Sequence, residues 1–326
     1  SWLVGAEMVI RDRMKKQSEQ TGVRADVMRA HLALLLANIG WGVIAPVSKM
    51  VLLSGTITSL ALSGIRISGA AFLFLIFTWV LPKSFETRQQ VDKKDIFRLS
   101  LCSLLIISAN QGLYIIGVGL TDPVDSAVMC SLTPVLTMVL AAMFLHFRMT
   151  WLKVGGVMMG LAGVLMLVSG TAESEIAVNP VLGNLLCLGA QLCAAIYYVG
   201  FEGLIRKYSP YSLMKWMFFI STLTYVPLCL PDMLRIDYSA LPGEVWAGLA
   251  FIITIPTFFG YLMIPLAQRS LKPTVVSAYS YLQPVFAAIV AVIMSVGDFG
   301  WGKAIATLLI FVGIYFVNRS STRHTA

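Results

Sequence analysis

Apolar stretches of about 20 residues recur along the whole chain, and the polar joints between them are short. A helix of about this length crosses a hydrocarbon core of roughly 30 Å. Hydrophobic residues make up 58% of the 326 residues and charged residues only 12%, which leaves no room for a separate soluble domain. The sequence therefore predicts an all-α integral membrane protein.

The basic residues orient these stretches across the membrane. We expect ten transmembrane helices, at 30–53, 57–81, 96–118, 123–145, 151–169, 181–201, 211–231, 245–268, 273–295 and 301–318. If both chain ends are cytoplasmic, only Lys49, Arg235 and Lys303 of the basic residues in the joints fall on the opposite side. Basic residues gather on the cytoplasmic side of membrane proteins. We therefore expect cytoplasmic termini, and the cytoplasmic (inner) membrane if the protein is bacterial.

Two segments 150 residues apart are alike: LTDPVDSAVMCSLTPVL at 120–136 and SLKPTVVSAYSYLQPVF at 270–286. Their prolines share one register, in the pairs Pro123 with Pro273 and Pro134 with Pro284. A Trp-x-Lys triplet recurs at the same offset. Because five helices per repeat is an odd number, the second copy enters the membrane from the opposite side. Such inverted repeats are typical of transporters.

The repeat divides the chain into residues 29–170 and residues 181–319, with five helices each, flanked by cytoplasmic tails at 1–28 and 320–326. The first 28 residues lack the pattern of a signal peptide. We interpret them as a solvated tail, or as an extension upstream of initiation at Met28. A membrane-surface amphipathic helix is the alternative.

Pro134 and Pro284 fall about halfway along two predicted helices. A proline inside a helix frees the carbonyl four residues earlier, here at Cys130 and Ser280. In a membrane such a break is tolerated against neighbouring protein or a water-lined cavity. The polar residue before each proline would suit a cavity, whereas a kink satisfied by a neighbouring hydroxyl is the alternative. Pro46 predicts a further break in the first helix.

Several stretches together resemble one transporter family. They are NIGWGVIAPVSK at 38–49, SGIRISGAAFL at 63–73, NQGLYIIGVGLTDPVDSAVMCSLTPV at 110–135, KVGGVMMGLAGVLML at 153–167 and KAIATLLIFVGIYFV at 303–317. In this order the chain resembles the EamA family of the drug/metabolite transporter superfamily. The resemblance implies two five-helix repeats and a central cavity, lined by helices 1, 3, 4, 6, 8 and 9, that moves small metabolites by alternating access. Family members often carry a glutamate before the fifth and the tenth helix, where this chain has His146 and Val296. Any role of those glutamates therefore does not carry over.

Polar and aromatic side chains inside the predicted spans are the candidate substrate-binding residues, since a polar group at membrane depth needs a partner or a function. They are Asn38, Trp41, Asn110, Gln111, Tyr114, Thr133, Gln191, Tyr197, Tyr261, Tyr281 and Gln283, with helix breaks at Pro46, Pro134 and Pro284. Hydrogen bonding between helices without a ligand is the alternative for the polar members. Of the adjacent Tyr197 and Tyr198, at least one is expected to point away from the cavity.

Arg66 lies about ten residues into the second predicted helix, too deep to reach the surface easily. It is a candidate partner for an anionic substrate, and pairing with carbonyls or an outer acid is the structural alternative. GVMMG at 156–160 matches the GxxxG packing pattern, either inside one chain or between two chains. We therefore expect a monomer or a homodimer.

These features predict a secondary transporter of small amphipathic metabolites, amino-acid-like or drug-like, that acts as an exporter. A flippase for a lipid-linked head group is the alternative. The expected partners are a small-molecule substrate and the lipid bilayer, without nucleic acid. No cofactor or metal is expected, because His31, His146 and His324 lack ligand spacing and the chain has no CxxC or phosphate-binding GxxxxGK[ST] loop.

An embedded enzyme would need a nucleophile with a base, or a metal site, and the sequence offers neither pattern. No carboxylate lies in the predicted membrane core, and Glu202 is at the end of the sixth helix. We therefore expect facilitated diffusion or exchange rather than carboxylate-based proton coupling.

Overall fold

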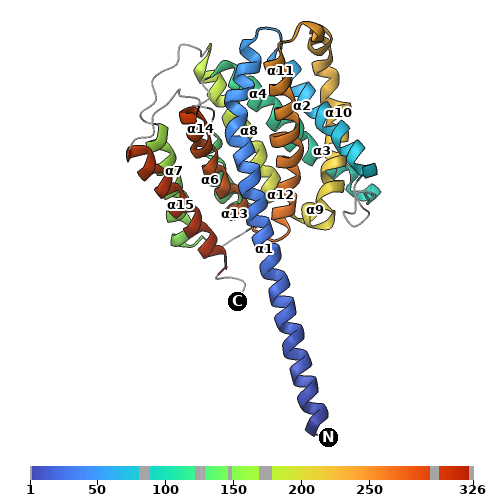
Figure 1. Ribbon diagram of the computed structural model, residues 1–326, viewed down its shortest axis with the longest axis vertical. Coiled ribbons are helices and arrows are strands. Elements are labelled where there is room, and N and C mark those ends of the chain that lie inside the picture. Colours follow the sequence, from blue (N-terminus) through green and yellow to red (C-terminus); the bar gives the residue numbers. More distant parts are fainter. Residues whose placement is uncertain are drawn as a thin grey trace.

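The computed structural model describes residues 2–80, 89–121, 126, 129–145, 149–168, 178–293 and 301–322, and every regular element among them is a helix (Figure 1). Six helical stretches are long and apolar enough to cross a membrane, at 25–53, 59–80, 93–120, 180–200, 210–234 and 243–268. Shorter apolar helices lie at 133–145 and 308–317. The chain is an integral membrane protein with an all-helical fold.

The helices follow one another with short connections. In the first half they are α1 (Trp2–Leu53), α2 (Ser59–Val80), α3 (Ile96–Ser103), α4 (Asn110–Leu120), α6 (Thr133–Leu145) and α7 (Trp151–Val168). In the second half they are α8 (Pro180–Gly200), α9 (Glu202–Lys207), α10 (Pro210–Leu234), α11 (Gly243–Ile252), α12 (Gly260–Gln268), α13 (Pro273–Ala278), α14 (Leu282–Ile293) and α15 (Trp301–Thr322). Short 3₁₀ turns are η2 (Lys93–Asp95) and η4 (Tyr238–Ala240).

Two π-helical segments interrupt long spans. The segment η3 (Leu104–Ala109) joins α3 to α4, and η5 (Ile253–Phe259) joins α11 to α12. Their last residues, Ala109 and Phe259, are 150 residues apart, the offset of the repeated sequence segments. A π-helical turn leaves backbone groups out of the regular α-helical pattern and is frequent at functional sites. The two halves thus carry the same irregularity at equivalent places.

The α-helical pattern is also interrupted just before Pro134 and Pro284. A turn precedes α6, and the 3₁₀ segment η6 (Tyr279–Tyr281) joins α13 to α14. The Thr133 hydroxyl donates to the Cys130 carbonyl over 2.6 Å, so a hydroxyl takes the carbonyl that Pro134 frees. The kink satisfied by a hydroxyl, which was the alternative from the sequence, therefore occurs at this break.

The prediction of a break at Pro46 was wrong, because α1 continues through this proline to Leu53. Another helix of the protein, α14, supports α1 at this place. A Cβ on Gly42 would lie 2.7 Å from the Gln283 carbonyl oxygen, so α14 packs directly on the turn of α1 before Pro46. The tail predicted for residues 1–28 is helical from Trp2 and continues α1, projecting beyond the bundle (Figure 1).

The helices pack in pairs that are related by exchange of the two halves. In the first half, α4 and α6 both pack on α8, the first helix of the second half. In the second half, the corresponding helices α12 and α14 both pack on α1, the first helix of the first half. α2 pairs with α10, and α7 with α15. The amino end of α1 and the end of α15 lie toward the same end of the bundle (Figure 1).

The glycines of GVMMG face the interior of the bundle. A Cβ on Gly156 would lie 2.8 Å from the Gly313 carbonyl oxygen of α15, and one on Gly160 would lie 2.5 Å from the Tyr281 ring. These small residues let α7 approach α15 and η6 closely. The motif thus serves packing within the chain.

Candidate functional site

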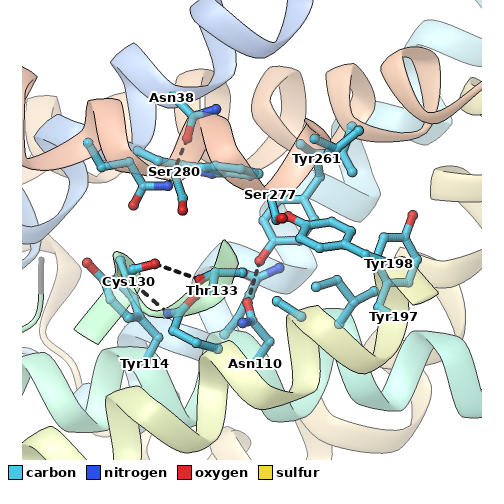
Figure 2. A pocket seen from close by; sticks show the side chains of 18 of the residues that line it. Asn38, Asn110, Tyr114, Cys130, Thr133, Tyr197, Tyr198, Tyr261, Ser277 and Ser280 are labelled. Carbon is cyan, nitrogen blue, oxygen red and sulfur yellow. Dashed lines mark hydrogen bonds between the residues drawn. The ribbon is translucent and has the colours of Figure 1, made fainter. Parts of the chain in front are cut away.

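A cavity of about 70 Å³ lies between the two halves of the bundle. Helices of both halves contribute its walls (Figure 2). The cavity is lined by all but one of the predicted substrate-binding residues, namely Asn38, Trp41, Asn110, Gln111, Tyr114, Thr133, Gln191, Tyr197, Tyr261 and Gln283. Arg66 also lines it.

Two hydrogen bonds join the first helix of each half to the broken helix of the other half. The Gln283 amide nitrogen on α14 donates to Asn38 Oδ1 on α1 over 2.9 Å. The Thr133 hydroxyl on α6 lies 2.8 Å from Gln191 Oε1 on α8. Because this hydroxyl has a single hydrogen, Gln191 and the Cys130 carbonyl share it. Thr133 and Gln283 are 150 residues apart, whereas their partners Gln191 and Asn38 are 153 residues apart. The two contacts therefore join corresponding helices without sharing one register.

Asn110 connects three helices at the floor of the cavity. Its amide nitrogen donates to the Ala190 carbonyl on α8 over 2.7 Å, and the Tyr261 hydroxyl on α12 donates to its Oδ1 over 3.0 Å. Figure 2 shows Asn110 and Tyr261 pointing toward one another. Asn110 is the first residue of α4, directly after the π-helical segment η3.

Trp41 forms an aromatic wall with Tyr261. The two rings meet edge to face with centroids 5.6 Å apart. The Trp41 indole donates to the Pro256 carbonyl over 2.7 Å. Pro256 lies in the π-helical segment η5, where a backbone carbonyl can turn out of the helix toward a side-chain donor.

Arg66 on α2 is held against the same π-helical segment. Its side chain is only 2% exposed, and its Nε donates to Thr257 Oγ1 over 3.2 Å. Thr257 in turn donates to the Ile252 carbonyl over 2.6 Å, which fixes the hydroxyl. Arg66 Nη1 is buried and has no hydrogen-bond partner in the structure. Among the described residues that line the cavity, none is an aspartate or glutamate.

Tyr281 lies away from the cavity. Its hydroxyl donates to the Val157 carbonyl on α7 over 2.8 Å, and its ring packs on Gly160. Tyr281 therefore packs between η6 and α7. Pro46, Pro134 and Pro284 likewise do not line the cavity.

The expectation for the adjacent tyrosines was wrong, because Tyr197 and Tyr198 both line the cavity. Their ring centroids are 5.6 Å apart near the end of α8, and Figure 2 shows both side chains. Ser277 and Ser280 also line it and were missed, although their places in the repeated segment offered a signal.

The described residues contain no group of three or more His, Cys, Asp or Glu side chains that could hold a metal ion. Cys130 is in the cavity wall, and its thiol accepts from the Gln191 amide over 3.3 Å. What the arrangement offers is amide, hydroxyl and guanidinium groups among aromatic faces. Such a surface can bind a small molecule that is partly polar and partly apolar.

A model of the EamA-like transporter family matches residues 28–169 and again residues 181–319. The chain belongs to the EamA family. Among the relatives of this EamA protein, a Bacillus subtilis protein named uncharacterized transporter YyaM is 26% identical over 220 residues, which cover 67% of this chain and 70% of that protein. A probable terminal-alkyne amino-acid exporter of Streptantibioticus cattleyicolor is 22% identical, with 81% of this chain and 84% of that protein covered.

A crystal structure that is 18% identical in sequence superposes with a TM-score of 0.70 and covers 91% of this chain and 99% of its own. This similarity concerns the fold alone. The family match, with relatives that are named as transporters, identifies the chain as a small-molecule transporter of the membrane.

Proposed function

We propose that this EamA protein is a secondary transporter that exports small amphipathic metabolites, amino-acid-like or drug-like, by alternating access between two inverted five-helix repeats. The repeats are residues 29–170 and 181–319, with ten membrane crossings in total and both termini cytoplasmic. The observation that carries the proposal is the central cavity, which both halves line and which hydrogen bonds between corresponding helices of the two halves bridge.

Three features support the inverted repeat. The family model matches twice, once in each half. The π-helical segments end at positions 150 residues apart. The helix pairs also interchange when the halves are exchanged. Two such halves can rock against one another around a fixed site, which is how transporters built from inverted repeats work.

The cavity composition supports amphipathic substrates. Tyr197, Tyr198, Tyr261 and Trp41 offer aromatic faces, and Asn110 offers an amide among them. An amino acid or a similar compound has an apolar body and a polar head, which suits this mixture. The name of the Streptantibioticus relative points the same way.

Metabolite analysis of the growth medium tests the proposal. Cells that express the parent should enrich a compound class relative to cells with the empty vector. The variants Trp41→Ala and Asn110→Ala, at equal membrane abundance, should lose the enrichment, whereas Tyr281→Phe should keep it. Equal enrichment by all variants would show that Trp41 and Asn110 are not needed for export, and the cavity would not be the substrate site. No enrichment by the parent would contradict export, and a requirement for a long acyl or prenyl chain would favour the flippase.

A further inference from the structure

The guanidinium of Arg66 is a buried charge in the middle of a membrane protein. Arg66 is the eighth residue of α2 and is 2% exposed. Charged groups at this depth normally pair with an opposite charge or with several carbonyls, because the hydrocarbon region cannot solvate them. The structure instead gives the Arg66 side chain a hydrogen bond from Nε to the neutral hydroxyl of Thr257. Its Nη1 lacks a partner.

Several acidic side chains that the structure describes pair with basic residues near the ends of the bundle. Asp92 and Asp95 bind Lys207 at the end of the bundle where α9 lies, Glu202 binds Arg206, and Asp232 lies 3.8 Å from Arg235 at the opposite end. None of the described acids lines the cavity. The described part of the protein therefore supplies no countercharge to Arg66.

A second buried polar side chain without a hydrogen-bond partner lines the same cavity. Gln111 is 1% exposed, and neither its amide nitrogen nor its oxygen has a hydrogen-bond partner in the structure. A carboxylate accepts several hydrogen bonds and matches the fork of a guanidinium. The two groups thus offer a carboxylate an ionic partner and an additional amide donor.

We infer that the transported substrate carries one carboxylate, which binds Arg66 and Gln111, while its apolar or aromatic body contacts Trp41 and Tyr261. The inference rests on the proposed function and names the substrate class. Arg66 is the sole basic residue among the described cavity lining, so it balances a single negative charge. An anion or a zwitterion is therefore favoured over a cation or a dianion.

The test compares three probes that share a phenylpropyl body: 3-phenylpropionate, 3-phenylpropanamide and 3-phenylpropylamine. Binding to the purified full-length protein in detergent at neutral pH is measured by titration of its thermal stability. We expect the acid to bind at least about tenfold more tightly than the amide or the amine.

Variants test whether Arg66 causes the preference for the acid. Arg66→Gln should weaken binding of the acid to the level of the amide, and Arg66→Lys should retain part of the preference because it retains the charge. Lys49→Gln is the matched control. Lys49 is another buried cation, but it donates to the carbonyls of Val118, Gly119 and Thr121, and it does not line the cavity.

Equal binding of acid and amide by the parent would overturn the inference, as would a preference that survives Arg66→Gln or no binding of the acid at all. If Arg66→Gln does not fold, the three-probe comparison on the parent and on Arg66→Lys still decides. The proposed function fails by a different result, which is the absence of export of compounds of every charge.

Discussion

The Gln283 amide donates to Asn38 Oδ1 over 2.9 Å, and this contact joins the broken helix of the second half to the first helix of the first half. Asn38 also donates to the Leu34 carbonyl, so its side chain is fully oriented. The bond lies between buried groups on elements that must separate if the halves rock. The hydrogen bond therefore holds α1 and α14 together beside the cavity.

Removing the hydrogen bond between Gln283 and Asn38 should destabilise the folded protein. Gln283→Leu leaves the Asn38 oxygen buried without its donor, which we expect to cost about 1–3 kcal/mol. The double variant with Asn38→Leu should recover part of the loss, since neither polar group is then left unpaired. Unfolding of the two single variants and the double variant in detergent measures the coupling. Additive losses would show that the two side chains do not interact.

The hydroxyls of Tyr261 and Tyr281 form a matched pair for separating function from packing. Tyr261 bonds Asn110 in the cavity, whereas Tyr281 bonds Val157 outside it. We expect Tyr261→Phe to lower transport by about 2- to 10-fold, the value of one hydrogen bond, and Tyr281→Phe to lower stability with little change in transport. Flux per folded protein in proteoliposomes measures both. Equal flux in the two variants would contradict the assigned roles.

Gly155 and Gly156 are adjacent on α7 but face different surroundings. A Cβ on Gly156 would meet Gly313 and Phe316 within about 3.0 Å, whereas one on Gly155 meets nothing within 4 Å. We expect Gly156→Ala to cost about 1–3 kcal/mol because α15 is pushed away. Gly155→Ala should be neutral or slightly stabilising, because alanine favours a helix. A thermal scan of the two proteins distinguishes them, and equal stability would refute the packing role of Gly156.

The sequence predicted the chemistry of the cavity better than its geometry. The 150-residue repeat placed Thr133 and Gln283 at equivalent sites, and membrane burial singled out Asn38, Asn110 and Gln191, all of which line one cavity. The π-helical segments were not predicted. LLIISA is an ordinary apolar run, and Pro256 in ITIPTFF indicates an interrupted helix but not its π-helical form, because the extra residue per turn is decided by tertiary packing. Tyr261 and Tyr281 look alike in the sequence, and only the local backbone decides which one reaches the cavity.

Glu202 should not act as a proton carrier. Its carboxylate lies 2.8 Å from Arg206 Nη2 at the start of the short helix α9, and it does not line the cavity. We expect Glu202→Gln to transport as the parent does, with the same response to an imposed pH gradient. Proteoliposomes with and without such a gradient provide the measurement. Proton-driven flux that Glu202→Gln abolishes would overturn this expectation.

Lys207 ties the connection before α3 to α9. Its ammonium donates to Asp92 Oδ2 over 2.6 Å and to Asp95 Oδ2 over 2.5 Å, and these hydrogen bonds raise the pKa of Lys207. A raised pKa contributes stability below the unfolded value of about 10.4, and the contribution is lost only as the pH rises through the folded value.

The stability difference between the parent and Lys207→Gln should therefore stay constant from about pH 6 to about pH 9 and shrink in high salt. Lys207→Arg, which keeps the charge, should stay close to the parent. Thermal scans across pH and salt measure the difference. If the parent and Lys207→Gln became equally stable at a pH between about 6 and about 9, Lys207 would not be held by the two aspartates.

Alternating access is the central claim, and distances between spin labels at the two ends of the bundle test it most directly. With the five native cysteines replaced, one pair of labels is placed at Phe97 and Arg206, and a second pair at Leu53 and Leu234, all exposed positions. Double electron–electron resonance is then recorded with and without the exported compound. Alternating access predicts that one pair moves apart as the other comes together. Distances that stay fixed, or that change together at both ends, would contradict it.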